Sequence, residues 1–336
     1  MKKGSCMNLR KLSKKLLPCL FVSVILSGAV VSTLFAIEPK EILRRSLEAQ
    51  FGLDFEGIQK AEFRLPGKNY TITTRVIRQK PDFSYTATLT PSRIRRLVTL
   101  DDGKFRMWHI RGSNKSEFFP SLNSPEAKEI KRKSLKLKFK NYKISQLIDS
   151  YVGGRSVYVI SLIPRHAGNP WQKVWIDKET YLPLKEEKYN WKGELFFAFH
   201  YTGINFDPRF SKEKLYQEFP QRLIKRSFFS RERFLSLKDL KAKIRFPVSI
   251  PHYLPPGYEF QEAVLLFKGK AVKITYTNGV GVICLSQTPS PRGYPETWFE
   301  DFEGAHPLVW RKRGKTFVLI ADISRKELIK IAQSVK

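Results

Sequence analysis

Cysteine and histidine are scarce in this chain of 336 residues, which has three cysteines and five histidines. Two cysteines, Cys6 and Cys19, lie near the N-terminus, and Cys284 lies in an apolar run that is typical of a buried strand. A buried thiol usually acts as a small hydrophobic side chain, so Cys284 is not expected to be a nucleophile.

The usual signatures of catalysis are missing as well. The histidines are scattered, with neither a His-x-His nor a His-Glu-x-x-His spacing, so no zinc site is expected. They are His109, His166, His200, His252 and His306. There is no Gly-x-Ser-x-Gly elbow and no phosphate loop, and Asp177 and Glu179 share one predicted hairpin turn, where acids are usually solvated. The sequence therefore predicts no enzyme, no catalytic residue, no metal and no cofactor.

Acidic residues are few compared with basic ones. The chain has 61 lysines and arginines against 31 acids, a net charge of +30, together with 42% hydrophobic and 13% aromatic residues. This composition argues against disorder, and the length allows two domains with proper cores. The charge attracts anions of any kind, so alone it does not choose between nucleic acid, anionic lipid and an acidic protein.

The N-terminus narrows that choice. Six basic residues and no acid precede or flank an apolar stretch at 16–36, which has small residues at possible cleavage sites. This is typical of a secretory signal over residues 1–36, although a retained membrane anchor is the alternative. Cleavage would remove Cys6 and Cys19, leave no disulfide and leave a net charge of about +24. A periplasmic protein would meet membranes, lipopolysaccharide-like anions or acidic protein segments, and no nucleic acid.

The clearest structural signal is an antiparallel meander at 151–202. Strand-like runs at 157–163, 171–177, 184–189 and 195–201 are separated by Gly, Pro, Asn and Asp. Such a sheet curls as it twists, and its concave face must be filled by a core, a helix or a ligand. Upstream, the sequence predicts a short amphipathic helix from Pro39 to near Gly52, further strands, and a hairpin turn at Asp101-Asp102-Gly103. Together these elements predict a first domain at 37–210.

Three lysines alternate with apolar residues after a predicted short helix that begins at Ser124-Pro125 and ends near Lys133. Lys136, Lys138 and Lys140 alternate with Leu135, Leu137 and Phe139, and this period of two favours an exposed strand with the lysines outward. Lysines of this kind protect a sheet edge from pairing, or they form an anion-binding surface. Both explanations fit the pattern.

The second half of the chain predicts a linker and a smaller domain. Residues 211–236 mix basic and aromatic residues without a clear period, which favours a linker that packs on a neighbouring surface or contacts a membrane. Residues 237–336 predict a small α+β domain with a helix at 237–243, several strands and a closing helix. Ser324 and Glu327 form a capping box at the start of that helix, and Ile323 and Leu328 form a hydrophobic staple.

Many bulky apolar residues fall on the curved sheet of the first domain. They are Phe83, Tyr85, Phe105, Trp108, Tyr158, Trp175, Phe197 and Phe199. Ordinary core packing under the first helix explains most of such a set. The more specific hypothesis is an apolar cavity for an acyl chain, since burial is worth about 0.8 kcal/mol for each CH₂ group. A half-closed barrel with a helix across its mouth would provide that cavity.

A recognisable pattern runs from Gly154 to Leu184. It reads Gly-Arg, a strand, Pro-Arg, a loop, an apolar residue with Ile-Asp-Lys-Glu-Thr, and then Leu-Pro. The second domain adds Phe246-Pro247-Val248, the run at 253–258 and the ending at 331–335. These stretches resemble the MucB/RseB family of periplasmic regulators of an extracytoplasmic-stress sigma factor, and the lipoprotein-carrier (LolA/LolB-like) fold shares a looser version of the first pattern.

The resemblance implies an α+β protein with two parts. The first would be a half-open antiparallel β-barrel with helices on its concave face, and the second a smaller α+β domain. Together they would hold the periplasmic segment of a membrane-spanning anti-sigma factor and shield it from proteolysis, until a lipid or lipopolysaccharide in the cavity releases it. A periplasmic lipid or lipoprotein carrier is the alternative, and it would not need the second domain. A hydrolase of the cell envelope lacks a nucleophile–base arrangement.

Overall fold

The computed structural model describes residues 37–65, 68–114, 116–220, 229–289 and 307–336. Residues 37–336 form one compact unit. Within the described residues, none of the helices has the length and apolar character needed to span a bilayer. The predicted signal segment lies outside the described residues and stays a prediction.

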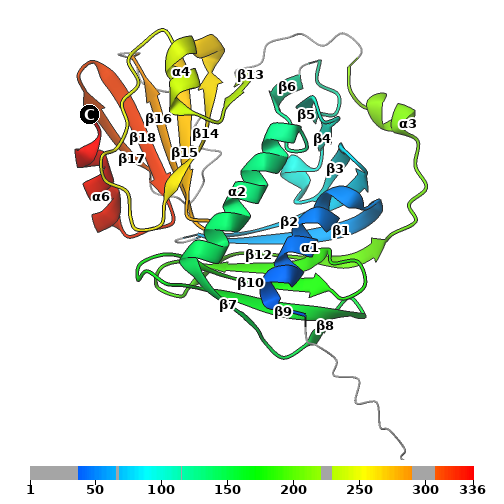
Figure 1. The fold of residues 1–336 in the computed structure, drawn as a ribbon. Helices are drawn as coiled ribbons and strands as arrows, with labels where there is room; N and C mark the ends of the chain where they lie inside the picture. Colours follow the sequence, from blue (N-terminus) through cyan, green and yellow to red (C-terminus); the bar gives the residue numbers. More distant parts are fainter. Residues whose placement is uncertain (1–36, 66–67, 115, 221–228, 290–306) are drawn as a thin grey trace, which may run out of the picture. The chain divides into compact units, whose positions relative to one another are not determined.

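The first sheet has twelve antiparallel strands. These are β1 (Phe55–Leu65), β2 (Lys68–Gln79), β3 (Phe83–Thr90), β4 (Leu97–Asp101), β5 (Phe105–Ile110), β6 (Ser116–Pro120), β7 (Tyr142–Gln146), β8 (Ser150–Val152), β9 (Arg155–Pro164), β10 (Trp171–Asp177), β11 (Pro183–Tyr189) and β12 (Leu195–Asn205). The order is β6-β5-β4-β3-β2-β1-β12-β11-β10-β9-β7, and β8 pairs with β9. Since β6 and β7 at the two ends do not pair, the sheet is open and not a closed barrel. Figure 1 shows α1 (Pro39–Gly52) and α2 (Pro125–Asn141) on the same side of it.

The predicted meander and hairpin are confirmed. β9, β10, β11 and β12 are neighbours in that order and cover the predicted runs. The hairpin of β4 and β5 turns at 101–103, and Gly103 has a φ of +86°, the left-handed conformation that such a turn requires. The α+β class is also confirmed, because a small number of helices accompanies a largely antiparallel structure.

The strand predicted at Lys136, Lys138 and Lys140 is wrong, because these residues belong to the last turns of α2. The Ser124 side chain accepts a hydrogen bond from the amide of Ala127, and no Gly or Pro interrupts the chain between Pro125 and Asn141. An alternation over only six residues is too short to exclude a helix, so the upstream cap decides. On the helix, Lys136 and Lys140 are exposed, whereas Lys138 is partly buried and lies on the opposite side.

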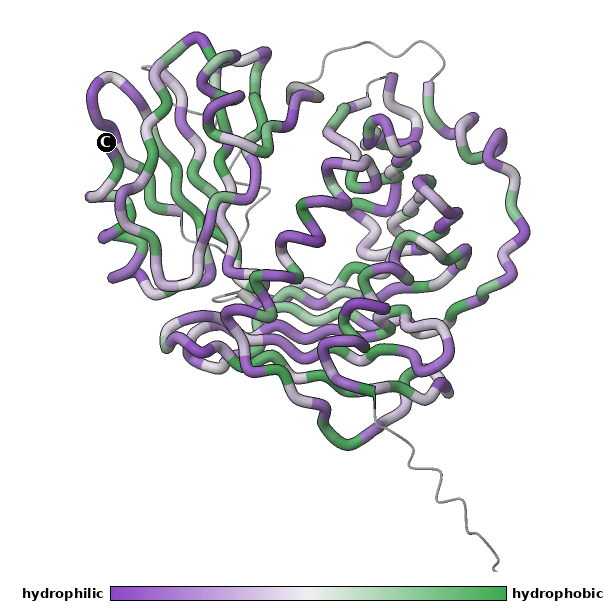
Figure 2. Tube along the Cα trace, viewed as in Figure 1, coloured by the Kyte–Doolittle hydropathy of each residue, from purple (hydrophilic) through white to green (hydrophobic). Residues whose placement is uncertain are grey.

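The second sheet has six antiparallel strands in the order β13-β14-β15-β16-β18-β17. They are β13 (Phe229–Phe234), β14 (Glu259–Leu266), β15 (Ala271–Thr277), β16 (Val282–Thr288), β17 (Leu308–Lys312) and β18 (Lys315–Ala321). In Figure 2 apolar positions follow these strands, whereas α2 is largely hydrophilic. The predicted helices are present as α4 (Leu237–Lys243) and α6 (Arg325–Ser334), and Ser324 caps α6 by accepting from the amide of Glu327.

Two regular elements lie in the stretch predicted as a linker. α3 (Lys212–Tyr216) begins at Ser211, whose side chain accepts from the amide of Lys214. β13 pairs with β14, so the second sheet starts before residue 237. Two short 3₁₀ turns complete the described elements, η1 (Ser92–Ile94) and η2 (Phe267–Gly269). The domain boundaries at 210 and 237 stay a prediction.

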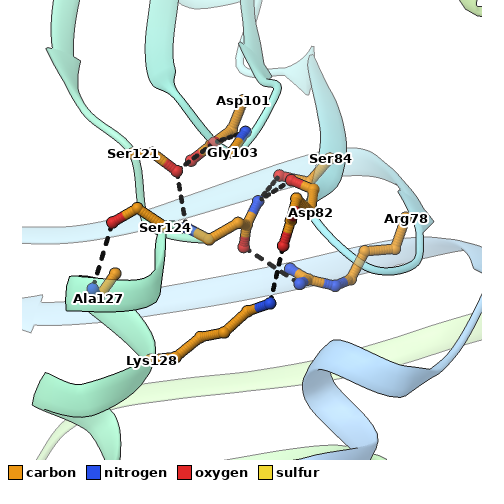
Figure 3. Close-up of polar contacts among 10 residues, drawn as sticks. Arg78, Asp82, Ser84, Asp101, Gly103, Ser121, Ser124, Ala127 and Lys128 are labelled. Carbon is orange, nitrogen blue, oxygen red and sulfur yellow. Dashed lines mark hydrogen bonds and ion pairs between the residues drawn. The ribbon is translucent and has the colours of Figure 1, made fainter.

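The N-terminal end of α2 is fixed to the first sheet by a buried aspartate. The Asp101 carboxylate accepts from the Ser121 hydroxyl at 2.6 Å and from the Leu122 amide at 2.7 Å. The Asn123 side chain donates to the Ser84 hydroxyl and to the Asp82 carbonyl at 3.1 and 2.8 Å (Figure 3). The buried Asp101 and Asn123 side chains therefore both have partners, and the first turn of α2 is held over β3 and β4.

The C-terminal end of α2 contacts turns of the second sheet. The buried Asn141 amide nitrogen donates to the carbonyls of Gly257 and Asn278, each at 3.0 Å. The Ser134 hydroxyl donates to the Gly279 carbonyl at 3.2 Å. A Cβ added at Gly279 would lie 2.6 Å from the Lys138 backbone nitrogen. Glycine at 279 therefore allows the β15–β16 turn to approach the helix backbone.

Replacing Gly279 with alanine tests this contact, with Gly269→Ala as the matched control. Both glycines have positive φ values, +105° and +84°, but nothing lies within 4 Å of a Cβ at Gly269. Backbone strain alone should lower the free energy of unfolding by about 1 kcal/mol in each variant. Gly279→Ala should lose a further 1–3 kcal/mol, roughly, because the helix backbone cannot move aside. Urea unfolding measures both, and equal losses would show that the turn does not press on α2.

Candidate ligand pocket

A pocket of about 290 Å³ lies between the two helices, β10, β11 and the β15–β16 turn. Its apolar lining comes from α1, α2 and both sheets: Leu43, Leu47, Leu135, Val174, Pro183, Val280 and Val282. Its polar lining is Ser46, Gln50, Lys131, Ser134, Lys138, Gln172, Glu186, Lys188, Gln261 and Thr277, and Gly279 completes it. The volume lies at the lower end of the range for small-molecule sites.

Positive charge dominates the polar part of this pocket. Three lysines, Lys131, Lys138 and Lys188, face one carboxylate, Glu186. Lys188 pairs with Glu186 at 3.2 Å, and the Lys138 ammonium donates to the Gln172 side-chain oxygen at 3.0 Å. Burial lowers the pKa of Lys138 to about 8, with Glu186 opposing and Lys188 adding to the shift. The pocket therefore suits a molecule with both apolar and negatively charged parts.

Three of the aromatic residues predicted to line a cavity lie in a separate packed cluster. Phe83 and Tyr85 are buried there, and Phe105 packs against it. Leu215 and Phe219, which follow the first sheet in the chain, cover this cluster. The Tyr85 hydroxyl donates to Glu218 at 2.8 Å and accepts from Arg111 at 2.9 Å. These residues thus hold the segment around α3 against the sheet.

The other five aromatic residues are spread over the first sheet. Trp175 alternates along β10 with Val174, which lines the pocket, so Trp175 points away from it. Tyr158 stacks on Tyr181 with ring centres 6.2 Å apart, and Trp108 packs on Phe119 at 4.7 Å.

Phe197 and Phe199 adjoin the pocket: the Lys188 ammonium lies 5.4 Å from the Phe197 ring centre, and the two phenylalanine rings are 6.2 Å apart. None of the eight aromatic residues lines this pocket. A cavity built from them stays a prediction.

The three lysines predicted to form an anionic-ligand surface do not share a face. Lys138 lines the pocket, Lys140 pairs with Glu259 at 2.8 Å, and Lys136 is exposed. Their role toward anions also stays a prediction.

The sequence places the pocket residues of α2 on one face of a helix, but it does not show that this face lines a pocket. Lys131, Ser134, Leu135 and Lys138 are spaced at i, i+3, i+4 and i+7, which places them on one helix face. The strand predicted at 135–140 would instead place Leu135 and Lys138 on opposite faces. Likewise Leu43 and Leu47 belong to the predicted stripe of the first helix, but their pattern does not distinguish a pocket wall from a core.

No three metal-ligating side chains converge anywhere in the described ranges. The expected absence of a metal stays a prediction.

The described residues form a large, open antiparallel sheet with helices on one face, followed by a smaller sheet with its own helices. Among solved structures with this fold, the MucA/MucB complex of Pseudomonas aeruginosa is similar over 89% of this chain and 98% of its own, with 15% identity and a TM-score of 0.60. A crystal structure of MucB is similar over 90% of this chain and 98% of its own, with 15% identity and a TM-score of 0.57. The predicted resemblance to MucB is thus confirmed in the fold.

The sequence comparisons add little. A family model described as "-like: Uncharacterized protein" matches residues 133–206, less than half of the chain. No curated protein matches the sequence.

The buried lysine of the pocket gives a prediction about pH. Below about pH 8 both the folded and the unfolded chain carry the Lys138 proton, so the cost of burying the charge is constant. Between about pH 8 and 10.5 the unfolded chain binds more protons, so the free energy of unfolding should rise with pH. Lys131, whose pKa burial also lowers to about 8, acts in the same direction.

Lys138→Met should therefore raise the free energy of unfolding at about pH 7 by roughly 2 kcal/mol, after the loss of the bond to Gln172. The variant should also gain less stability than the natural protein between about pH 8 and 10. Urea unfolding at several pH values measures both effects, with the exposed Lys136→Met as control. If the two variants behave alike, Lys138 is not buried as a charge.

Proposed function

We propose that this protein is an exported, non-enzymatic regulator that binds the periplasmic part of a membrane-spanning anti-sigma factor. The observation that supports this most directly is the fold shared with MucB, which extends over both sheets and whose solved structures include complexes with MucA. A carrier built from the first sheet alone would lack the second sheet and the contacts that Asn141 makes with it. The second sheet is what separates this proposal from a simple carrier.

The proposed partner is acidic. The exported chain carries about +24 net charge, and two lysines at the end of α2, Lys136 and Lys140, are exposed. Positive surface charge accelerates association with an acidic segment and disfavours cationic competitors. Bound regulator would shield that segment from proteolysis.

A lipid or lipopolysaccharide ligand is part of the proposal. Its acyl part would lie against Leu43, Leu47 and Val174 in the pocket, and Phe197 and Phe199 adjoin the same region. Since the pocket is bounded by α2 and by the β15–β16 turn, a ligand in it contacts residues of both sheets. Occupation of the pocket would therefore change how the two sheets are held together, and this is how a ligand would release the partner.

The direct test is binding of the exported chain to the periplasmic segments of single-span membrane proteins encoded beside extracytoplasmic sigma factors in the same organism. Isothermal titration should give a Kd of about 1 μM or tighter for one of them, weakening as salt is raised. The bound segment should also resist cleavage by the envelope protease that degrades it alone. Absence of binding to every such segment, together with transfer of lipid between two vesicle populations, would favour the carrier instead.

A further inference from the structure

Two arginines and one aspartate stand in a row across the first sheet. Arg78 on β2 lies opposite Ser84 on β3, Ser84 lies opposite Asp101 on β4, and Asp101 lies opposite Arg106 on β5. Neighbouring strands are about 4.8 Å apart, and residues directly opposite one another point to the same face. All four side chains therefore share one face of the sheet.

The helices bring two more cations to this face. Lys128 and Lys131 are three residues apart on α2 and so point in a similar direction. Their ammonium groups lie 5.3 and 4.5 Å from the ring centre of Phe51 in the last turn of α1. The Arg78 guanidinium lies 5.9 Å from the same ring centre. One aromatic ring thus contacts three cations, and the attraction of a single ring cannot balance their charges.

Arg106 lies at the other end of the row, three strands from Arg78, next to aromatic rings of β5 and β6. Its guanidinium lies 5.4 Å from the ring centre of Trp108 and 5.2 Å from that of Phe119. No carboxylate of the described residues forms an ion pair with it. The neighbouring Arg233 pairs with Glu262 at 2.6 Å and donates to the Ser121 carbonyl, so Glu262 is engaged elsewhere.

The nearby carboxylates are engaged as well. Asp82 pairs with Lys128 at 2.7 Å (Figure 3). Asp101 accepts from the Gly103 amide, the Ser121 hydroxyl and the Leu122 amide, and it forms no ion pair with a described residue. Arg78, Arg106 and Lys131 therefore share one carboxylate that is already hydrogen-bonded three times.

The two arginines also keep unused donors. The Nε atoms of Arg78 and Arg106 are buried and have no hydrogen-bond partner within the described part of the chain. Arg78 donates from its Nη2 to the Asn123 side chain at 3.1 Å. Burial lowers the pKa of both arginines, and it lowers the pKa of Lys131 to about 8, with the Arg78 charge adding to that shift. Buried donors and unneutralised charges are costly unless an acceptor binds them.

We propose that Arg78 and Lys131, which both lie against the Phe51 ring, form a binding site for a phosphate or carboxylate group, placed between α1, α2 and β2. The oxygens of such a group accept from guanidinium Nε–H and from an ammonium, and they supply the missing negative charge. Lys131 also lines the pocket that contains Leu43 and Leu47. A ligand with an anionic head at Arg78 and Lys131 and an apolar tail in the pocket uses both features.

The site deepens the lipid-binding part of the proposed function and rests on it, but it does not depend on the protein partner, since it concerns the first sheet and its helices. It is tested by isothermal titration of the exported chain with three probes: inorganic phosphate, n-dodecyl phosphate and the uncharged n-dodecyl maltoside, each below its micelle concentration. The expected order is n-dodecyl phosphate tightest, inorganic phosphate weaker and the maltoside weakest. Binding of inorganic phosphate as tight as that of the dodecyl ester would assign the site to the free anion. No saturable binding of either phosphate, or equal binding of the uncharged probe, would overturn the site.

Variants connect the binding to these residues. Arg78→Gln and Lys131→Met should each weaken n-dodecyl phosphate binding by about tenfold or more, the loss expected for one charged hydrogen bond. Lys136→Met, which changes an exposed lysine of the same helix, should alter it by less than about twofold. Equal affinities in all four proteins would overturn the assignment.

The melting temperature of the natural protein tests the site even if the variants fold poorly. In the natural protein n-dodecyl phosphate should raise the melting temperature progressively as its concentration exceeds the Kd, and an equal concentration of chloride should not. No rise in the natural protein would contradict the site without reference to any variant.

Discussion

The docking of α2 is the constraint on which the rest of the structure depends. One end of the helix is fixed to β4 through Asp101, and the other end is fixed to turns of the second sheet through Asn141. A buried amide that makes two hydrogen bonds to backbone carbonyls leaves little freedom in how the turns approach. Glycine at 257 and 279 makes that approach sterically possible. The helix in turn forms one wall of the pocket and carries Lys131 over Phe51.

The same docking explains why charge is buried near the helix. α2 has few apolar residues, and its inward face presents Lys128, Lys131 and Lys138 to the first sheet. Hydrophobic packing alone would not select this sequence for a covered position. Cations retained there at a cost in stability point to a ligand that needs them, in agreement with the separate row of arginines across β2 to β5.

Much of the architecture could be predicted from the sequence, because turns and caps act locally. The Asp101-Asp102-Gly103 turn, the four strands of the meander and the Ser324 cap are all present where the residues indicate them. α2 beyond Lys133 could not be predicted from the alternation, since a pattern of six residues is too short to exclude a helix. The pocket and the cation cluster depend on which strands lie opposite one another and on contacts far apart in the chain, and no local pattern carries that information.

We propose above all that an anionic amphiphile occupies the space between α1, α2 and the first sheet. Native mass spectrometry of the chain purified from its own envelope, without detergent, tests this most directly. We predict a population that carries one acidic lipid or lipid fragment, with a phosphate or carboxylate group, and that loses it on Arg78→Gln substitution. Protein that is uniformly free of ligand, or that carries only neutral lipid, would contradict the account.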